Sequence, residues 1–466
     1  MAKSKDGGLT WQRYPGNPFL AGPPEKFAVT GWRDPFVFSN KFLDDILSQD
    51  ADVGIYGIIA GGIRDQTPTI FLYSLDPNDL MQWTFRSTMI NLGPNFSPHP
   101  RFGDFGLNWE VTNIMTLYDE KSQSFDIIVA GVEGCVTASK DEIALGQPVN
   151  RARRTGRGQK WLLGNFGSGT NSAMNMEYVS GGHLDYGAFY AANSFYDPVS
   201  QAQIVHGWIL EEDLPDKLRE QQGWSGLISL PRELSMTTVE DVDQSCVELL
   251  KDIPGFTCKP DSHGTWTVTT LSIIPDLRTQ LLRNPQMRPE SQPNAVTSAH
   301  KPSISFPKGL AHFELHASFK VESSTVEQGL HLFHSLGTPH SNSHSCALAN
   351  SSDRMLYTTI LHNALDNTVC IQRDRSSDSS LNIKTETEVA PHILLLTKSE
   401  KGELRTEKLN LRVFYDVSVL EVFVNNRIAI TTRVYPDSGT CFGIEGFGNN
   451  LGGVEDFVVW PLKSGG

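Results

Sequence analysis

Short apolar runs separated by turn-forming residues dominate the first 295 residues, and this pattern constrains the fold more than any other feature. The runs are rich in β-branched and aromatic residues, as strands are. With 40 Gly and 26 Pro among 466 residues and no regular period, the chain favours many turns over long bundled helices. The expected strands are 36–38, 53–59, 69–74, 114–118, 125–132, 189–194 and 204–210. The sequence therefore predicts an all-β protein, with helices only at 42–47 and 215–222.

Two segments share a turn signature that ends in tryptophan. They are SKDGGLTW at residues 4–11 and SLDPNDLMQW at residues 74–83. A Ser or Asp side chain can close such a hairpin turn while the indole packs between sheets. Turns of this kind recur in the blades of β-propellers, so the two copies indicate a repeated unit.

A polar, proline-rich segment divides the chain. Residues 284–302 have the composition of a linker, and we place the boundary there, between domains 1–295 and 296–466. Beyond it, apolar and polar residues alternate over 311–322, 411–415 and 417–424, as in half-buried antiparallel strands. The second domain is therefore predicted to be a β-sandwich.

The charge balance argues against a nucleic-acid partner. Lys and Arg number 39 against 53 Asp and Glu, a net charge of −14, whereas nucleic-acid binding needs a basic surface. No apolar run is long enough to span a membrane, so we expect no membrane partner. Residues 1–8 are too polar for a signal peptide. Localisation stays open, because a secreted protein would fit if the N-terminus were incomplete, and the sequence indicates no oligomeric state.

The pattern of histidines and cysteines indicates no metal site. The 13 histidines form no HExxH motif, and the six cysteines form no CxxC pair. We therefore expect neither a metal nor another cofactor.

Three segments place a carboxylate where neighbours would hold it. In residues 31–35, Pro35 favours an extended backbone at Asp34, and Arg33 would keep a neighbouring carboxylate ionised. Burial of Glu110 against Trp109 would raise the pKa of Glu110, as a general acid requires. Glu133 lies between nearby glycines that would let a ligand approach. Each segment also fits an ordinary structural role: a surface ion pair, an edge-strand Glu facing water, and a turn after a strand.

Paired carboxylates are the usual machinery for cleaving a glycosidic bond. They lie about 5–5.5 Å apart in retaining enzymes and about 6.5–9.5 Å apart in inverting ones. Asp34 and Glu110 belong to different predicted strands, which suits two neighbouring blades whose inner strands end at one pocket.

These segments resemble motifs of glycoside hydrolase family 32, the invertases, inulinases and fructosyltransferases that act on β-fructosides. Arg33-Asp34-Pro35 resembles the family's Arg-Asp-Pro motif, and NWEVTN at 108–113 resembles its Trp-Glu-Cys-Pro-Asp segment. YAANSF at 190–195 is similar to its Tyr-Ala-x-x-Ser/Thr-Phe strand, and 417–436 resembles the signature of its C-terminal sandwich.

The resemblance implies a five-bladed β-propeller with a funnel-shaped active site, followed by a β-sandwich. Asp34 would stabilise the transition state, and Glu110 would be the acid/base. The residues implied in substrate binding are Trp32, Arg33, Glu133, Tyr190 and Glu211, with Glu211 on the acceptor side. The substrate would be sucrose or a fructo-oligosaccharide, and the reaction hydrolysis or fructosyl transfer by a retaining mechanism.

The family's nucleophile, an Asp on the first blade, has no match in this sequence. The carboxylates before Asp34 are Asp6 and Glu25, neither in a matching motif. We expect from this that the chain is an N-terminally incomplete propeller that lacks its first blade, and that the loss impairs a double displacement.

Two other interpretations fit parts of the sequence. A carbohydrate-binding pseudoenzyme would keep the pocket without the chemistry, as the unmatched nucleophile indicates. A sialidase-like propeller would account for SKDGGLTW, but it needs an arginine cluster for the sugar carboxylate. The Arg-rich run at 151–154 instead has the character of a solvated loop.

Overall fold

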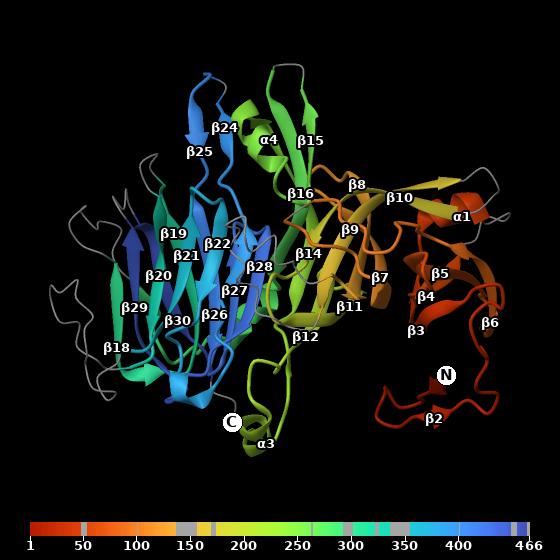
Figure 1. Cartoon of the computed structure of the whole chain (residues 1–466), viewed down its shortest axis with the longest axis horizontal. Coiled ribbons are helices and arrows are strands. Elements are labelled where there is room, and N and C mark those ends of the chain that lie inside the picture. Colours follow the sequence, from red (N-terminus) through yellow and green to blue (C-terminus); the bar gives the residue numbers. More distant parts are fainter. Residues whose placement is uncertain are drawn as a thin grey trace.

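The structure is a computed structural model in which strands predominate and every described helix is short (Figure 1). It describes residues 1–47, 54–99, 101–136, 156–168, 174–261, 264–291, 302–321, 326–335, 355–399, 401–448 and 454–463. The all-β prediction is confirmed. The predicted boundary at residue 295 and the Arg-rich run at 151–154 lie outside the described residues.

Two four-stranded antiparallel sheets follow one another along the first part of the chain, and each keeps its strands in sequence order. The first sheet consists of β3 (Val29–Phe38), β4 (Ile55–Ile63), β5 (Thr67–Asp76) and β6 (Asp79–Thr88). The second consists of β7 (Asn108–Tyr118), β8 (Ser124–Glu133), β9 (Arg157–Ser168) and β10 (Met174–His183). Apolar side chains from both sheets, including Ile58, Leu72, Trp109 and Ile128, pack into one buried cluster, which holds the first sheet against the second.

The third sheet has eight strands and joins the two halves of the chain. Its main path is β11 (Phe189–Asp197), β12 (Ala202–Ile209), β14 (Arg232–Val242), β16 (Trp266–Pro275) and β15 (Phe256–Pro260). The short strand β13 (Leu227–Ile228) pairs with β12. From the C-terminal half, β24 (Leu396–Lys398) pairs with β14, and β25 (Leu404–Thr406) pairs with β24.

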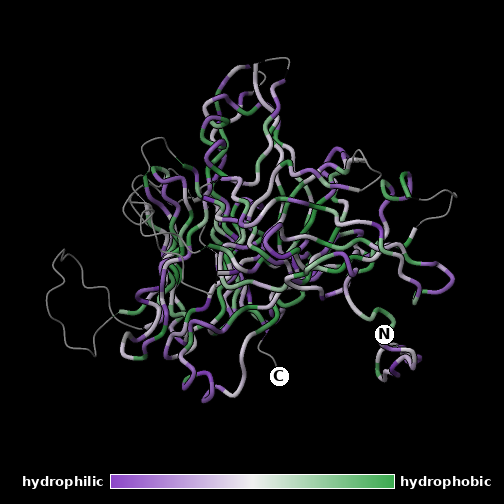
Figure 2. Tube along the Cα trace, turned by 45° about the vertical axis from the view of Figure 1, so that its right-hand side comes forward, coloured by the Kyte–Doolittle hydropathy of each residue, from purple (hydrophilic) through white to green (hydrophobic). Residues whose placement is uncertain are grey.

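Two six-stranded sheets form the β-sandwich in the left half of Figure 1. One is β17 (Glu290–Ser291), β30 (Val454–Pro461), β19 (His312–Phe319), β26 (Leu409–Asp416), β27 (Val419–Val424) and β28 (Ile428–Arg433). The other is β18 (Ser303–Leu310), β29 (Cys441–Gly448), β20 (Glu327–Phe333), β21 (Tyr357–Asn363), β22 (Thr368–Gln372) and β23 (Glu388–Pro391). Alternate apolar residues of both sheets, such as Leu315, Ile360 and Val422, fill the space between them. Figure 2 shows green hydrophobic stretches where the sheets pack and purple hydrophilic stretches on projecting turns.

The helices of the described residues are single short segments between strands. They are α1 (Lys41–Leu47), α3 (Asp216–Gln222) and α4 (Gln244–Leu250), with 3-10 turns η1 (Leu277–Leu282) and η2 (Ser379–Leu381). The first two lie where the sequence predicts helices. The third was not predicted, although Asp243 caps it by accepting a hydrogen bond from the Ser245 amide. In the part of the chain that the structure describes, no helix has the length and apolar character needed to cross a membrane.

The two Ser/Asp turns form as predicted, but their tryptophans differ. Asp6 accepts from the Thr10 amide at 2.9 Å, and the turn at 74–83 closes through a 2.8 Å bond from the Asn78 amide to Asp76. Trp83 packs against Tyr73 at 5.7 Å between ring centroids, whereas Trp11 is 66% exposed. The first turn belongs to the hairpin of β1 (Ala2–Lys3) and β2 (Gln12–Arg13), which projects from the body in Figure 1. The expectation of a packed indole is therefore wrong for Trp11.

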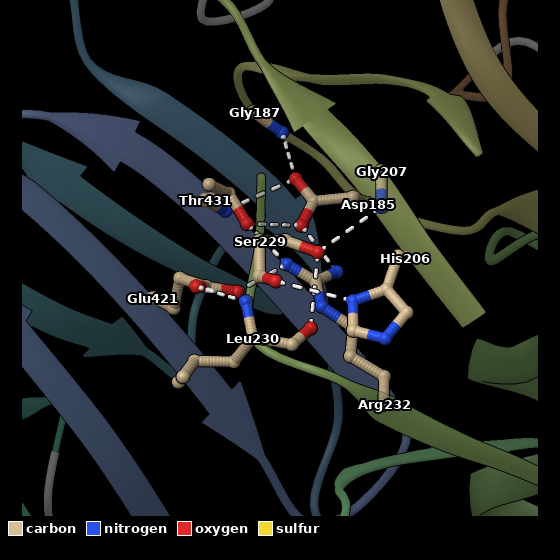
Figure 3. Close-up of polar contacts among 9 residues, drawn as sticks. All are labelled: Asp185, Gly187, His206, Gly207, Ser229, Leu230, Arg232, Glu421 and Thr431. Atoms are coloured by element: carbon tan, nitrogen blue, oxygen red, sulfur yellow. Dashed lines mark hydrogen bonds and ion pairs between the residues drawn. The ribbon is translucent and has the colours of Figure 1, made fainter. Parts of the chain in front are cut away.

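Buried charges join the third sheet to the sandwich (Figure 3). Arg232 on β14 is fully buried and donates to Asp185 Oδ2 at 2.8 Å and to Glu421 Oε2 at 2.7 Å. Thr431 on β28 donates its amide to Asp185 Oδ1 at 3.0 Å, and Leu230 donates its amide to Glu421 Oε1 at 2.9 Å. Because buried carboxylates are costly without such partners, this network fixes the sandwich against the propeller-type sheets.

Candidate active site

Strands β3, β7 and β11 each carry a β-bulge: between Arg33 and Pro35 in β3, between Glu110 and Asn113 in β7, and between Tyr190 and Asn193 in β11. One residue of each bulge has a positive φ: Asp34 at 59°, Val111 at 40° and Ala191 at 49°. Non-glycine residues rarely adopt this conformation, and bulges bend a strand and redirect its side chains. The expected extended backbone at Asp34 is therefore wrong, because the bulge overrides the preference of a residue that precedes proline. The three bulges direct side chains of three sheets towards one place.

Asp34 and Glu110 come together around Arg33. Arg33 Nε donates to Glu110 Oε1 at 2.9 Å and lies 4.0 Å from Asp34 Oδ2. Glu110 Oε1 and Asp34 Oδ2 are therefore no more than about 7 Å apart, which is no farther than the widest spacing of paired carboxyls that flank a glycosidic bond. Asp34 Oδ2 also accepts from the Val111 amide at 3.0 Å, which ties it to the bulge beside Glu110.

Glu133 completes the acidic cluster from the end of β8. Arg33 Nη2 donates to Glu133 Oε2 at 2.7 Å and also bonds to Glu110. Asn108 Nδ2 donates to the same Glu133 oxygen at 3.0 Å, and Thr30 Oγ1 donates to Asn108 Oδ1 at 3.1 Å. The side chains of Arg33, Asp34 and Glu133 are 41%, 36% and 36% exposed, so a solute can reach the cluster.

The third sheet contributes Tyr190, whose Oη donates to Glu110 Oε2 at 2.8 Å. Partial burial favours the neutral acid, but hydrogen bonds from Arg33 and Tyr190 and the charge of Arg33 outweigh it. The pKa of Glu110 therefore lies below its usual value. Burial and the nearby carboxylates raise the pKa of Tyr190, so the phenol stays protonated and donates. The predicted rise in the Glu110 pKa is wrong, because Trp109 packs into the core while Glu110 faces the two donors.

Two of the residues singled out for substrate binding lie elsewhere. Trp32 packs against the apolar cluster of Ile59, Phe71 and Tyr73, outside the acidic cluster. Glu211 is 1% exposed and accepts from Arg433 Nη2 and Tyr435 Oη, each at 2.7 Å. This burial leaves Glu211 no open side for a sugar, and it corrects the expectation of an acceptor contact.

Two residues that the sequence did not single out lie beside the cluster. Arg157, the first residue of β9, pairs in register with Glu133, and its guanidinium carbon is 5.0 Å from the centroid of the Tyr190 ring. Trp208 on β12 pairs in register with Tyr190 and is 40% exposed. A Trp within the predicted strand 204–210 was the available signal for Trp208, whereas the place of Arg157 depends on the pairing of β8 with β9.

The arrangement supplies hydrogen-bond donors and acceptors for a polyhydroxylated ligand together with a carboxyl group for proton transfer. Among the described residues, no group of three or more His, Cys, Asp or Glu side chains is placed to hold a metal ion. The charge that offsets the three carboxylates here is the Arg33 guanidinium.

Family models cover most of the chain. The model of the glycosyl hydrolases family 32 N-terminal domain matches residues 1–246, and the model of the family 32 C-terminal domain matches residues 278–461. The chain belongs to glycosyl hydrolase family 32. The predicted membership of this family is therefore confirmed.

Curated family 32 relatives are longer than this chain. Vacuolar acid β-fructofuranosidase 4 of Arabidopsis thaliana is 24% identical over 472 residues, which cover 98% of this chain and 62% of the relative. Acid β-fructofuranosidase AIV-18 of Capsicum annuum is 26% identical over 295 residues, which cover 60% of this chain and 41% of the relative.

Solved structures share the fold at low sequence identity. Aspergillus kawachii β-fructofuranosidase, complexed with glycerol, superposes with a TM-score of 0.79 at 22% identity, covering 98% of this chain and 75% of that one. The A. japonicus fructosyltransferase superposes with a TM-score of 0.79 at 22% identity, covering 99% and 77%. The fructan 1-exohydrolase IIa of Cichorium intybus, in complex with 1-kestose, gives 0.61 at 17%, covering 97% and 76%. The prediction of a propeller followed by a β-sandwich is confirmed, with three propeller-type sheets in the described residues.

Proposed function

We propose that this family 32 chain binds a β-D-fructofuranosyl unit between Asp34 and Glu110 and cleaves or transfers it from sucrose or a fructo-oligosaccharide. The observation that carries the proposal is the approach of these two carboxylates to less than about 7 Å at the bulges of β3 and β7. The family membership supports it, as do relatives named β-fructofuranosidases and a solved neighbour that holds 1-kestose.

In this proposal Glu110 is the acid/base. It protonates the oxygen of the leaving sugar and then takes a proton from the water or sugar hydroxyl that accepts the fructosyl group. Asp34 accepts hydrogen bonds from fructosyl hydroxyls, and these bonds strengthen as positive charge develops on the ring. Arg33 and Glu133 bind further hydroxyls, and Tyr190 orients the Glu110 carboxyl through its hydrogen bond.

This mechanism requires that Glu110 carries a proton when the bond is cleaved. Arg33 and Tyr190 stabilise the carboxylate in the ligand-free protein, so the acid form that cleaves the bond is favoured at acidic pH. A sugar hydroxyl that draws Arg33 towards Glu133 would remove one of these donors and raise the pKa of Glu110 at the moment of binding.

Cleavage also needs the acid form of Glu110. Both oxygens of Glu110 accept hydrogen bonds, from Arg33 and from Tyr190, and these donors hold its pKa below the usual value. This observation favours a second candidate, a protein that binds the fructosyl unit without turning it over. The two candidates differ in turnover and agree in binding.

The test combines calorimetry with an assay for released fructose. Sucrose, 1-kestose and sialic acid are titrated into the purified chain, and fructose is then measured after incubation with the two fructosides. Binding of fructosides together with release or transfer of fructose supports the proposal, and binding alone selects the second candidate. Binding of sialic acid without fructoside binding overturns both.

A further inference from the structure

Two buried side chains of the second sheet bind the backbone of β11, which is the end strand of the third sheet as described. The Ala192 amide donates to Gln159 Oε1 at 3.1 Å. The Ser194 amide donates to Asn113 Oδ1 at 2.7 Å, and the Ser194 hydroxyl donates to the same oxygen at 2.8 Å. Backbone groups along the edge of a sheet have no strand partner of their own. The two side chains therefore take the place of a neighbouring strand along this part of β11.

Asn113 also joins β11 to the bulge of β7. Its Nδ2 donates to the Val111 carbonyl oxygen at 2.9 Å, while its Oδ1 accepts from Ser194. Val111 has the positive φ of this bulge and follows Glu110 directly, and its amide donates to Asp34. Asn113 is 1% exposed, so these hydrogen bonds are shielded from water. Asn113 therefore links β11 to the bulge on which both carboxylates depend.

Gln159 lies in one row with the proposed acid. Glu110 on β7 pairs in register with Gly131 on β8, which pairs with Gln159 on β9. Register partners in an antiparallel sheet lie on the same face, so these three positions form a line. Tyr190 lies over the middle of it, because a Cβ atom at Gly131 would be 3.2 Å from the Tyr190 ring. The Tyr190 hydroxyl reaches Glu110 at one end of the row, and Gln159 at the other end binds Ala192.

The hydrogen bond to Ala192 is the polar contact that Gln159 supplies. Gln159 is 1% exposed, and its Nε2 has no hydrogen-bond partner among the described residues. A buried donor without a partner destabilises the folded state. Methionine would fill a similar volume without that cost, so packing alone does not account for a glutamine at this position.

The position of β11 controls one of the groups that act on Glu110. The charged and titratable groups around this carboxyl are Arg33, Asp34, Glu133, Tyr190 and, against the Tyr190 ring, Arg157. Of these, Tyr190 alone comes from the third sheet. A small movement of β11 away from the second sheet would lengthen the hydrogen bond from Tyr190 and leave the bond from Arg33 in place.

We propose that Gln159 and Asn113 are positioning residues that hold β11 on the second sheet, so that the Tyr190 hydroxyl stays bonded to Glu110 while this carboxyl gives and takes its proton. Both side chains are buried, and both act through Tyr190. This inference rests on the proposed function, because it takes Glu110 as the acid/base.

The test measures the pKa of Glu110 in the ligand-free protein. Carbon NMR follows a chain labelled in its glutamate carboxyls through a pH titration, and Glu110→Gln identifies the signal. In Gln159→Met the Ala192 amide loses its acceptor, so the bond from Tyr190 weakens and the pKa of Glu110 rises towards its usual value. An unchanged pKa overturns the inference.

A double-mutant cycle shows whether Gln159 acts through Tyr190. Tyr190→Phe removes the hydroxyl, so we expect the effect of Gln159→Met to shrink by at least about half when it is added to Tyr190→Phe. A purely structural role for Gln159 predicts the same effect with and without the hydroxyl. An equal effect in both backgrounds therefore overturns the inference.

Gln203→Met is the matched control. Gln203 Nε2 donates to Ser194 Oγ at 3.0 Å, but Gln203 lies on β12, within the third sheet. The same substitution there removes a hydrogen bond to β11 without loosening its contact with the second sheet. The pKa of Glu110 should not change, and a rise equal to that in Gln159→Met overturns the inference.

Two further measurements guard against misfolding of Gln159→Met. Asn113→Leu should also raise the pKa of Glu110, and it leaves the Ser194 amide an acceptor, because this amide also donates to Asn193 Oδ1 at 2.8 Å. In the unsubstituted protein, the amides of Ala192 and Ser194 should exchange with solvent at least about 100-fold more slowly than amides of an open strand edge. Exchange at the open-edge rate, or no change in Asn113→Leu, overturns the inference.

Failure of the proposed function gives a different result. A chain that binds neither sucrose nor 1-kestose overturns the proposed function. The titration of Glu110 needs no fructoside, so it still decides whether the two side chains hold Tyr190 on this carboxyl.

Discussion

Tyr190 and Glu110 join the second and third sheets at the candidate active site through a 2.8 Å hydrogen bond from the phenol to the carboxylate. The other Glu110 oxygen accepts from Arg33 Nε at 2.9 Å. Glu110 therefore has a donor on each oxygen, and its pKa is held low although its site is partly buried. The group proposed as the acid is thus ionised by its neighbours until a ligand or a lower pH changes the balance.

Tyr190→Phe is expected to move the pH profile of kcat/KM. The substitution removes one donor to the carboxylate, so the pKa of Glu110 rises towards its usual value. Activity that needs protonated Glu110 falls as pH rises through this pKa, and kcat/KM reports the pKa of the free protein. The limb on which kcat/KM falls with rising pH should therefore shift to higher pH. Tyr196→Phe, an exposed tyrosine on the same strand, is the control, and an equal shift in both variants would contradict this account.

Arg232→Met is expected to lower the free energy of unfolding by about 3–5 kcal/mol, because it leaves Asp185 and Glu421 buried without their cation. Urea unfolding at pH 7 measures the change. Lys121→Met removes the exposed ion pair with Glu240 and should cost no more than about 1 kcal/mol. If the two variants lose equal stability, the buried network does not hold the sandwich to the third sheet.

His362→Gln is expected to reduce the acid sensitivity of the sandwich. Burial lowers the pKa of His362 from 6.5 to about 4, so folding favours the neutral ring. Above pH 6.5 the ring is neutral in both states, whereas at lower pH the unfolded chain binds a proton that the folded state does not. This stability is lost as pH falls towards 4, and the free energy of unfolding should fall by about 2 kcal/mol between pH 7 and pH 4.5.

Urea unfolding at those two pH values checks this expectation. The difference in unfolding free energy should be smaller in His362→Gln than in the unsubstituted protein. His312→Gln serves as the control, because His312 lies at the surface beside Asp416. An unchanged difference in His362→Gln would show that this ring does not carry the pH dependence.

Local sequence was enough to predict several of the strands and most of the cluster. Arg33 and Asp34 lie in one short segment, Glu110 in another, and Tyr190 begins a third, so each could be recognised from its immediate neighbours. The apolar runs at 125–132 and 189–194 became β8 and β11 because β-branched and aromatic residues favour strands wherever they pack.

Long-range pairing decided what the local sequence could not. The left-handed backbone at Asp34 arises where β3 shifts its register against β4, which no local preference encodes. Glu211 meets Arg433, which lies 222 residues further along the chain, so its burial depends on the docking of the sandwich. Arg157 reaches Tyr190 only because β9 pairs with β8 and the third sheet lies against the second.

The most direct test of the central claim is the rate of fructose release from sucrose by the full chain, by Asp34→Asn and by Glu110→Gln. The account predicts release above a control without protein and a loss of at least about 100-fold in each variant, the usual contribution of a positioned acid or charge. Release at an unchanged rate in either variant would contradict the claim that Asp34 and Glu110 act together on one fructosyl unit.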